Sequence, residues 1–555
     1  MPHLALPTLT AYLRAHGIEV IQRDLNVEFF DALLTRESLE DSMARLREEA
    51  GRRILRLAPT ALTEGAQLAA RVEDAKAIFR SPAFFDGEAS LPAFLTLAQS
   101  LELASLPFAP TVLELTSYRP PVPADSSRSL LSVVDDSRRN IFLDFFRRRV
   151  LPDIAREQPD IVGISIPTLD QMIAGMTLGH LIKDAGLPCH VTIGGPHVSM
   201  LREQLPKVPA MFRLFDSAIV FDGEVALLRL AESLTGDRDL ARVPNLIYND
   251  HGVIRSTPVE AIAPPNLLPD FDGLPLERYL VPTPVLPMLS AHGCYHGKCG
   301  FCNVGYGGPA MFSQLDADFV VESMLALHAK YGTRHIFFAD EAITPRNLKA
   351  MSARLAEMGA PLHWCGCVRF DKALSRELLE HMAQGGCRML LFGLETAAER
   401  IIQRMMKGTQ PAEMSRILRD AAAAGIWNHT FFFFGFPGET MAEAQETVNF
   451  VYAHQDAIHS ASPGAFVLER YSPVARAPKR FGVTIKPNPD RDLAIYFDYD
   501  VASGLDEPMA DTLASRLIEV LPQKQFGQYY IHDSYRLLYA GDLREKAQPF
   551  PLWLA

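Results

Sequence analysis

The chain has 555 residues, of which 48% are hydrophobic and 22% charged, and its formal net charge at pH 7 is −12. This length predicts several domains, and the composition is typical of a globular protein with a sizeable core. The acidic balance argues against nucleic acid as the main partner, because binding to phosphates requires a basic face.

The sequence predicts neither a membrane span nor a leader. No stretch of about 18 uncharged apolar residues occurs, which is what a spanning helix requires. The start, MPHLALPTLTAYLRAHG, lacks the basic region, apolar region and cleavage site of a signal peptide. Seven cysteines are an odd and sparse set for a disulfide scaffold, which favours reduced thiols and a cytoplasmic location.

Taken in chain order, the first predicted elements are a helix over 6–17 and a short strand over 18–26. From about 30 to 150 apolar residues recur three and four positions apart, which predicts a helical insertion. The segment LTSYRPPVPADSS at 115–127 interrupts it as a loop.

Alternating strands and helices begin at residue 159. PDIVGISIP (159–167), CHVTIGGPH (189–197) and RLFDSAIVF (213–221) read as buried parallel strands, each followed by a helical stretch. VPNLIYNDHGVIRSTP (243–258) reads as a small hairpin. We therefore expect an α/β, Rossmann-like domain over 1–261 and a proline-rich linker over 262–284.

A second alternation predicts six strand–helix steps from residue 285. Amphipathic helices are expected at 316–330, 375–384 and 440–454. Six such steps favour a partial (β/α)6 barrel over 285–470, with a C-terminal α/β extension over 471–555. Chemistry in such barrels lies at the carboxyl ends of the strands. The expected strands are 285–291, 334–341, 362–370, 388–395, 429–436 and 464–469.

Three cysteines follow the first barrel strand with the spacing C-x4-C-x2-C: Cys294, Cys299 and Cys302. Zinc is one candidate, because His292 or His296 would complete a set of four ligands. The sharper reading is a 4Fe–4S cluster, in which three thiolates hold three irons and leave the fourth iron open. The other cysteines are read as core residues: Cys189, Cys365, Cys367 and Cys387.

An open iron at the mouth of a partial barrel resembles the radical S-adenosylmethionine (SAM) superfamily, over about 285–470. Members usually show C-x3-C-x2-C with an aromatic residue before the last cysteine. Here Phe301 holds that place and the first gap is one residue longer. Acidic residues follow strand 2 without the usual glycines, FGLET resembles the segment that reaches the SAM ribose and carboxylate, and GFPGE resembles the bend that cradles adenine. The SAM contacts that the resemblance implies are Phe301, Asp340, Glu341, Arg369, Glu395, Gly435 and Pro437.

The first domain resembles cobalamin-binding domains, in which a serine and a double glycine are similarly spaced. No D-x-H-x-x-G motif occurs, so the resemblance implies a cobalamin without a histidine below cobalt. Family members usually begin with a strand ahead of the helix expected at 6–17, so the sheet is expected to lack its first strand. An ordinary Rossmann-like domain is the alternative. The implied cobalamin contacts are Ser165, Thr168, Gly194, Gly195, His197, Gly223 and Glu224.

Together the two resemblances imply a cobalamin-dependent radical SAM enzyme. The reaction implied is methylation of an unactivated carbon through a 5′-deoxyadenosyl radical and methylcobalamin, with a flavodoxin- or ferredoxin-type reductant. The substrate is expected to be a small molecule or a peptide. Rearrangement or cyclisation with the same cofactors remains open, as do a non-catalytic cobalamin or iron–sulfur sensor and a zinc-stabilised binding protein.

Overall fold

The structure, a computed structural model, describes residues 1–49, 59–262, 266–309, 312–521 and 532–551. Two compact units are present. The barrel unit comprises Met1–Leu4, Thr283–Pro487 and Tyr496–Ala555, and the N-terminal unit comprises Ala5–Pro282 and Asn488–Ile495. Most of the predicted linker therefore belongs to the N-terminal unit, except that its residues 263–265 lie outside the described part.

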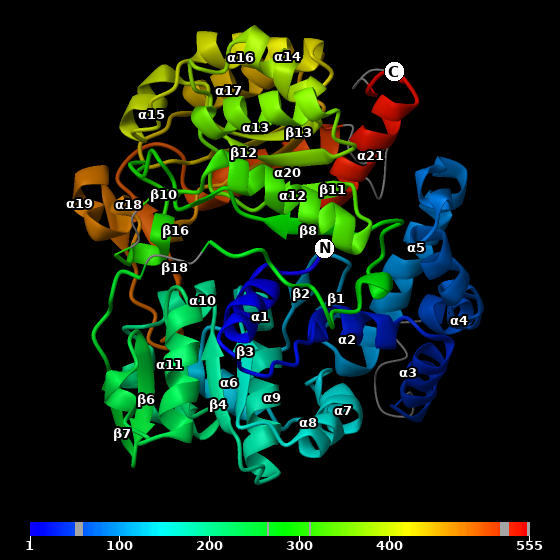
Figure 1. The fold of residues 1–555 in the computed structure, drawn as a ribbon, viewed down its shortest axis with the longest axis vertical. Coiled ribbons are helices and arrows are strands. Elements are labelled where there is room, and N and C mark those ends of the chain that lie inside the picture. Colours follow the sequence, from blue (N-terminus) through cyan, green and yellow to red (C-terminus); the bar gives the residue numbers. More distant parts are fainter. Residues whose placement is uncertain (50–58, 263–265, 310–311, 522–531, 552–555) are drawn as a thin grey trace. The chain divides into compact units, whose positions relative to one another are not determined.

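The N-terminal unit contains the predicted strand–helix alternation (Figure 1). Three strands are parallel, and a hairpin completes a five-stranded sheet in the order β3-β4-β5-β6-β7. The expected α/β class is confirmed, and β3 lies at the edge of the described sheet. The strands are β3 (Ile161–Ser165), β4 (His190–Gly194), β5 (Ser217–Ile219), β6 (Leu246–Asp250) and β7 (Val253–Ser256).

The helical insertion is confirmed in its described residues, and its expected loop holds only the two-residue strands β1 and β2. Helices α9 and α11 follow β3 and β5 as predicted. The helices of this unit and the two short strands are α1 (Ala5–Ala15), α2 (Leu25–Leu33), α3 (Arg36–Glu49), α4 (Pro59–Phe79), α5 (Gly87–Ser105), β1 (Val112–Leu113), β2 (Tyr118–Arg119), α6 (Ser127–Val133), α7 (Leu143–Phe145), α8 (Leu151–Glu157), α9 (Met172–Asp184), α10 (Pro196–Met200) and α11 (Glu224–Thr235).

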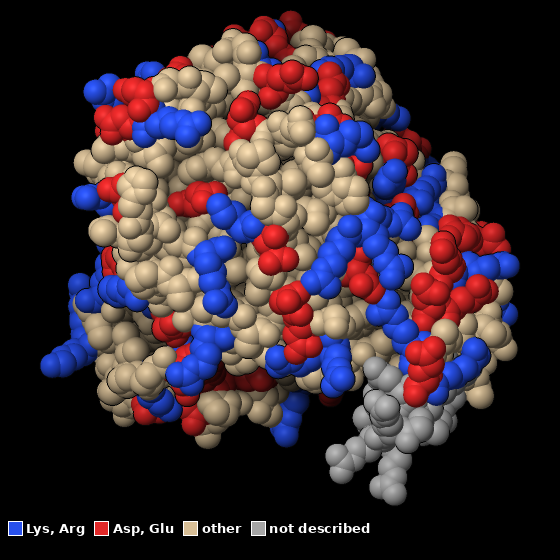
Figure 2. All heavy atoms as spheres, turned by 90° about the horizontal axis from the view of Figure 1, so that it is seen from below, with Lys and Arg blue, Asp and Glu red and all other residues tan. Residues whose placement is uncertain are grey.

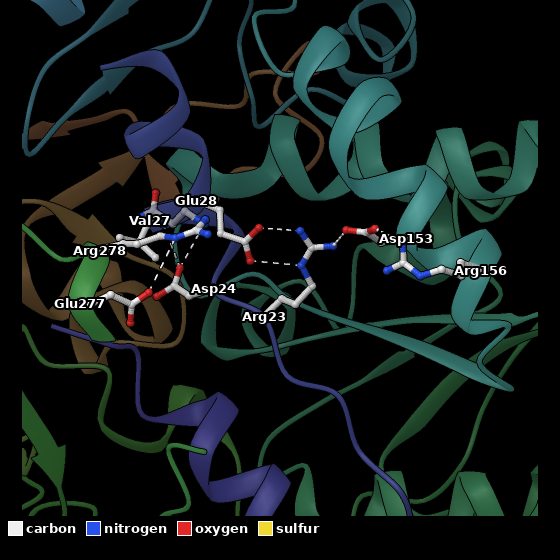
Figure 3. A network of polar contacts seen from close by, with 9 residues as sticks. Arg23, Asp24, Val27, Glu28, Asp153, Arg156, Glu277 and Arg278 are labelled. Atoms are coloured by element: carbon white, nitrogen blue, oxygen red, sulfur yellow. Dashed lines mark hydrogen bonds and ion pairs between the residues drawn. The ribbon is translucent and has the colours of Figure 1, made fainter. Parts of the chain in front are cut away.

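The strand predicted over 18–26 is wrong. Residues 18–24 pair with no strand, and helix α2 begins at Leu25. Asp24 caps this helix by accepting from the backbone N–H of Val27 at 3.2 Å, and Arg23 donates to both carboxylate oxygens of Glu28 (Figure 3). Polar side chains that bind local backbone compete with strand pairing, and here they direct the chain into a helix.

The same polar network joins segments that are distant in sequence. Arg23 also donates to Asp153 of α8 at 3.1 Å (Figure 3). The Tyr279 hydroxyl donates to the second oxygen of Asp24 at 2.5 Å, and both residues are buried. The segment before α2 is therefore fixed by side chains instead of a sheet.

A second short connection belongs to this unit although it comes from the C-terminal part of the chain. In residues 488–495, Arg491 Nε donates to the buried carboxylate of Asp125 at 2.6 Å. Asp492 accepts from the backbone N–H of Ser127 at 2.8 Å and from its hydroxyl at 2.5 Å. This segment thus stabilises the start of α6.

The barrel unit is built on six parallel strands in consecutive order, β8-β11-β12-β13-β14-β15 (Figure 1). Five of the six predicted strands are confirmed. The sixth was placed too late: β15 spans Ser460–Ala465, and Leu468–Glu469 forms β16, which pairs with β18. The other strands are β8 (Val285–Met288), β11 (His335–Phe338), β12 (His363–Val368), β13 (Cys387–Glu395) and β14 (Trp427–Phe434).

Helices connect the barrel strands, and the C-terminal extension is the predicted α/β mixture. The large side chains Trp364, Phe392, Trp427, Phe432 and Phe434 are fully buried. The remaining elements are β9 (Ala291–His292), β10 (Ser313–Gln314), α12 (Ala317–Tyr331), α13 (Pro345–Met358), α14 (Arg376–Gln384), α15 (Glu399–Arg404), α16 (Pro411–Ala423), α17 (Met441–Ala453), α18 (Pro473–Arg476), α19 (Pro478–Phe481), β17 (Val483–Ile485), β18 (Tyr496–Phe497), β19 (Tyr499–Val501), α20 (Glu507–Val520) and α21 (Asp533–Glu545).

Within the described residues, no helix is both long and apolar enough to cross a membrane. On the face shown in Figure 2, Lys and Arg side chains are interspersed with Asp and Glu side chains. Among the cysteines read as core residues, Cys189, Cys365 and Cys387 are buried, whereas Cys367 is half-buried.

Replacing Asp24 with alanine removes a helix cap and the acceptor of the buried Tyr279 hydroxyl. We expect D24A to lower the free energy of unfolding by about 2–4 kcal/mol, from a cap worth about 1 kcal/mol and a buried hydroxyl left unpaired. The matched control is D86A, because Asp86 caps α5 through Glu88 N–H at 3.0 Å and is exposed. Its loss should be about 1 kcal/mol. Equal losses in urea unfolding would contradict the role of Tyr279.

Candidate functional site

The three clustered cysteines lie on a loop at the carboxyl end of the first barrel strand. The loop runs from β9 to β10, which pair with each other antiparallel. Gly300 N–H donates to the Met405 carbonyl at 2.7 Å, and Cys302 N–H donates to the Cys299 carbonyl at 3.2 Å. The loop is therefore anchored to the segment after α15, and a tight turn separates its last two cysteines.

The three thiols are close enough to influence one another. Burial, with smaller contributions from the charges of Glu341, Cys299 and Cys294, raises the pKa of Cys302 to about 12. Burial also raises the pKa of Cys299. Like charges that converge in this way favour binding of a cation or a cationic cluster, which would hold the thiols as thiolates.

In the part of the chain that the structure describes, no three His, Cys, Asp or Glu side chains are arranged to hold a single metal ion. His296, one candidate fourth zinc ligand, instead donates through Nε2 to the Met406 carbonyl at 2.8 Å. A four-iron cluster is larger than one ion, so its thiolates need not converge on one point. Three neighbouring thiols at a barrel mouth are the donor set that such a cluster requires.

Arg369, at the end of β12, contacts the cysteine loop instead of standing free. Its Nη1 donates to Cys299 Sγ at 3.7 Å, and its Nη2 donates to the Lys407 carbonyl. The guanidinium also lies over the Tyr295 ring, 6.0 Å from the centroid. Arg369 is 9% exposed, so the predicted contact with the SAM carboxylate would have to share a side chain that already has three partners.

Glu395, at the end of β13, forms a buried ion pair. Its Oε1 accepts from Lys407 Nζ at 2.7 Å, and both residues are less than 10% exposed. The strand bulges between Gly393 and Glu395, and Glu395 adopts a positive φ of 62°. A Cβ at Gly393 would lie 2.5 Å from Glu395 Oε1. Glycine at this position therefore leaves room for the ion pair.

The Lys407 ammonium also lies over the Phe301 ring, 5.7 Å from the centroid. Phe301 in turn packs edge-on against Phe433 of β14, at 5.2 Å between centroids. Phe301 thus links the cysteine loop to two strand ends. In this structure Phe301 packs around the cysteine loop.

The two acidic residues after β11 have different surroundings. Asp340 is 3% exposed and accepts from Ser290 N–H at 2.9 Å and from the Ser290 hydroxyl at 2.6 Å. Burial raises its pKa to about 7. Asp340 therefore fixes the start of the cysteine loop, and its predicted contact with SAM is not favoured by this geometry.

Glu341 is exposed, yet the protein around it raises its pKa. The cause is desolvation by the surrounding protein, which disfavours the charged carboxylate even though the side chain is still reached by solvent. Its charge in turn raises the pKa of Cys302 and of Glu469, whose pKa is about 7. Glu341 is thus the predicted acidic residue that remains open to a ligand.

The GFPGE turn follows β14. Gly435 has a φ of 83°, and its N–H donates to Glu439 Oε2 at 2.6 Å. A Cβ at Gly435 would lie 2.7 Å from the Ala510 Cβ. The Pro437 carbonyl accepts from Arg404 Nε at 2.7 Å. These contacts make a rigid turn at the edge where the other strand ends meet.

In the N-terminal unit, buried polar atoms without partners gather where β3 and β4 end. Ser165 Oγ, His197 Nδ1 and His197 Nε2 are buried and have no hydrogen-bond partner among the described residues. Burial lowers the pKa of His197 to about 4. Leaving such groups unpaired costs about 1–3 kcal/mol each, so the site fits a ligand that offers hydrogen bonds.

The double glycine between these residues permits a close backbone approach. Gly195 has a φ of 106°, and a Cβ there would lie 2.8 Å from the Ile166 carbonyl oxygen. Gly194 accepts from Ile166 N–H at 2.8 Å. The two glycines thus let the backbone at the ends of β3 and β4 approach closely.

The other predicted cobalamin contacts lie at neighbouring helix starts. Thr168 is exposed and its side chain caps no helix. Glu224 is buried at the start of α11, and burial raises its pKa to about 7. Gly223 precedes it, where a Cβ would lie 3.3 Å from the Leu9 side chain. These residues follow β3 and β5, whose carboxyl ends share one edge of the sheet.

The comparison with family models identifies the kind of domain that the barrel strands form. Residues 288–451 match the radical SAM superfamily. This segment is a radical SAM domain. It contains the cysteine loop, Arg369, the Glu395–Lys407 pair and the GFPGE turn.

Two curated relatives are methyltransferases by name. An uncharacterised methyltransferase of Pyrococcus horikoshii is 27% identical over 305 residues, covering 54% of this chain and 65% of the relative. The cytidylyl-2-hydroxyethylphosphonate methyltransferase of Streptomyces wedmorensis is 24% identical over 355 residues, covering 55% and 64%. The matches thus span just under two thirds of these relatives' lengths.

Two solved structures share the fold beyond the radical SAM domain. The cobalamin-dependent S-adenosylmethionine radical enzyme OxsB aligns with a TM-score of 0.55 at 15% identity, covering 72% of this chain and 69% of that one. The radical S-adenosylmethionine methyltransferase TsrM from Kitasatospora setae aligns with a TM-score of 0.50 at 17% identity, covering 62% and 74%. The chain therefore has the fold of cobalamin-dependent radical SAM enzymes.

Sequence reasoning missed Lys407, which the radical SAM domain buries beside Glu395. Lys407 follows α15 in the segment RMMKGT, and nothing in that segment distinguishes it from a surface lysine. Hydrogen bonds from the Gly300 N–H to the Met405 carbonyl and from His296 Nε2 to the Met406 carbonyl bring this segment to the cysteine loop.

Replacing Lys407 with methionine would leave Glu395 buried without its cation. We expect K407M to lower the free energy of unfolding by about 3–5 kcal/mol, because an unpaired buried charge is costly. The double variant E395Q/K407M should recover a large part of that loss. The control K486M breaks the exposed Lys486–Asp500 pair of the same unit and should have little effect. Equal effects of K407M and K486M in urea unfolding would contradict the burial argument.

Proposed function

We propose that this chain is a cobalamin-dependent radical SAM enzyme that methylates an unactivated carbon of a small molecule or a peptide. The observation that carries the proposal is the grouping of Cys294, Cys299 and Cys302 on one loop, at the carboxyl end of the first strand of a radical SAM domain. The methyl outcome is supported by relatives whose names are those of methyltransferases. Rearrangement with the same cofactors would give a product without the added mass of a methyl group.

The cofactors would supply the reactive chemistry: reductive cleavage of SAM at the cluster and a methyl carrier in cobalamin. The chain supplies binding and orientation. The three thiols would hold the cluster, the exposed carboxylate of Glu341 would bind the SAM amino group, and the turn at Gly435 would offer its backbone to adenine. The proposal includes a flavodoxin- or ferredoxin-type electron donor and a cytoplasmic setting, in which the cysteines stay reduced.

Cobalamin binding is proposed for the N-terminal unit. Its support is the cost of Ser165 Oγ and both His197 nitrogens being buried without partners. Gly194 and Gly195, at the end of β4, would let the bulky nucleotide tail approach the backbone. Thr168, Gly223 and Glu224 would lie around the same edge of the sheet.

Cluster ligation is tested by anaerobic reconstitution of the full chain and of C294A, C299A and C302A. The wild type should hold about four irons, absorb near 400 nm and convert SAM to 5′-deoxyadenosine or S-adenosylhomocysteine. Each variant should lose most of the iron and all turnover. The control C189A changes a buried cysteine of the other unit and should keep both. A wild type that binds zinc but no iron would refute the proposal.

Cobalamin binding is tested by H197L. Leucine resembles imidazole in volume and has no polar atoms, so the unbound variant should be more stable than wild type while retaining less cobalamin through gel filtration. In wild type the depressed pKa of His197 removes stability as pH falls from 6.5 through 4, because the unfolded state binds the proton first. In H197L, this decrease of the free energy of unfolding between pH 6.5 and 4 should be absent. Unchanged cobalamin retention in H197L would exclude the contact.

A further inference from the structure

Arg369 occupies a position where the sequence predicts a partner for the SAM carboxylate, but its contacts point elsewhere. Its Nη1 lies 3.7 Å from Cys299 Sγ, and its Nη2 donates to the Lys407 carbonyl. The Tyr295 ring covers the guanidinium. These contacts direct the charge of Arg369 at a cluster thiol.

This guanidinium is buried without a carboxylate. Among the described residues Arg369 forms no ion pair, although it is only 9% exposed. A buried charge is costly unless an opposite charge and hydrogen bonds compensate it. The group beside it that can become anionic is the Cys299 thiol, so a thiolate at this position would complete the pair.

Lys407 does not change the requirement of Arg369 for an anionic partner. Its ammonium lies 2.7 Å from Glu395 Oε1, so that pair is already close to neutral. The Lys407 backbone contributes differently: its carbonyl accepts from Arg369 and fixes the orientation of the guanidinium. The geometry therefore leaves one uncompensated cation, and it is aimed at one of the three cysteines.

We propose that Arg369 is a positioning residue for the iron–sulfur cluster, donating an N–H···S hydrogen bond to the Cys299 thiolate. The inference rests on the proposed function and deepens it. Hydrogen bonds and positive charge beside cluster sulfur stabilise the reduced, more negative form. Arg369 thus raises the reduction potential of the cluster and strengthens its retention, before SAM binds.

The test uses the reconstituted full chain without SAM, and SAM affinity is measured in a separate titration. The midpoint potential of the cluster is measured by redox titration followed by electron paramagnetic resonance, and iron loss is followed after addition of a chelator. R369Q should shift the midpoint to a lower potential and lose iron about 10-fold faster, the size expected for partners of metal ligands. R369K should fall between R369Q and wild type, because lysine keeps the charge but loses the forked contact.

The matched control is R388Q. Arg388 belongs to β13 but lies at the opposite end of that strand, where it donates to the Ala383 carbonyl at 2.8 Å and the Cys387 carbonyl at 3.1 Å. R388Q removes a half-buried arginine of the same sheet, so it reports any general loss of stability. Its cluster should keep the midpoint potential of wild type.

An unchanged midpoint and unchanged iron loss in R369Q would overturn the inference, and a fall in SAM affinity alone would assign Arg369 to the SAM carboxylate instead. If R369Q does not fold, wild-type rates of iron loss in R369K overturn it equally. A wild type that assembles no cluster refutes the proposed function, which is a separate outcome.

Discussion

Burying a thiolate requires a cation close by, and this protein meets that requirement at the carboxyl ends of its barrel strands. Cys299 is buried, which alone would keep it a neutral thiol. Arg369 comes from the end of β12 and Lys407 from the segment after α15, and both charges counteract the effect of burial on the pKa of Cys299. The consecutive order of the parallel strands is what brings these segments to one edge. The bulge in β13 and the glycine at 393 leave room for the Glu395–Lys407 pair beside the cysteine loop.

Much of the architecture was predictable, because strands buried on both faces appear in the sequence as short, largely apolar runs. The apolar runs at 161–165, 190–194 and 427–434 fall where the structure has β3, β4 and β14. The predicted strands were wrong or misplaced where the hydrophobic pattern alone does not determine the local structure. The run at 18–26 is apolar enough for a strand, but Asp24 caps a helix there. The last barrel strand begins at Ser460, in a polar stretch that carries no strand signal.

The positions of the site residues could likewise be predicted from the sequence, whereas their contacts could not. The spacing of the three cysteines and the strand-end positions of Asp340, Arg369 and Glu395 could be read from the sequence. Their partners could not, because each lies on another segment that only the tertiary fold brings close: Ser290 for Asp340, Cys299 for Arg369 and Lys407 for Glu395. Residue type at a strand end indicates a polar site, whereas tertiary contacts decide whether that side chain binds a ligand or holds the site in shape.

The connection at 488–495 has a practical consequence. The N-terminal unit is not one continuous stretch of the chain. This short segment belongs to it, whereas the residues on both sides of the segment belong to the barrel unit. A fragment ending at Pro282 would lack Arg491 and Asp492, and so the partners of Asp125 and Ser127. The N-terminal unit is therefore complete only when the chain runs through the barrel unit as far as Ile495.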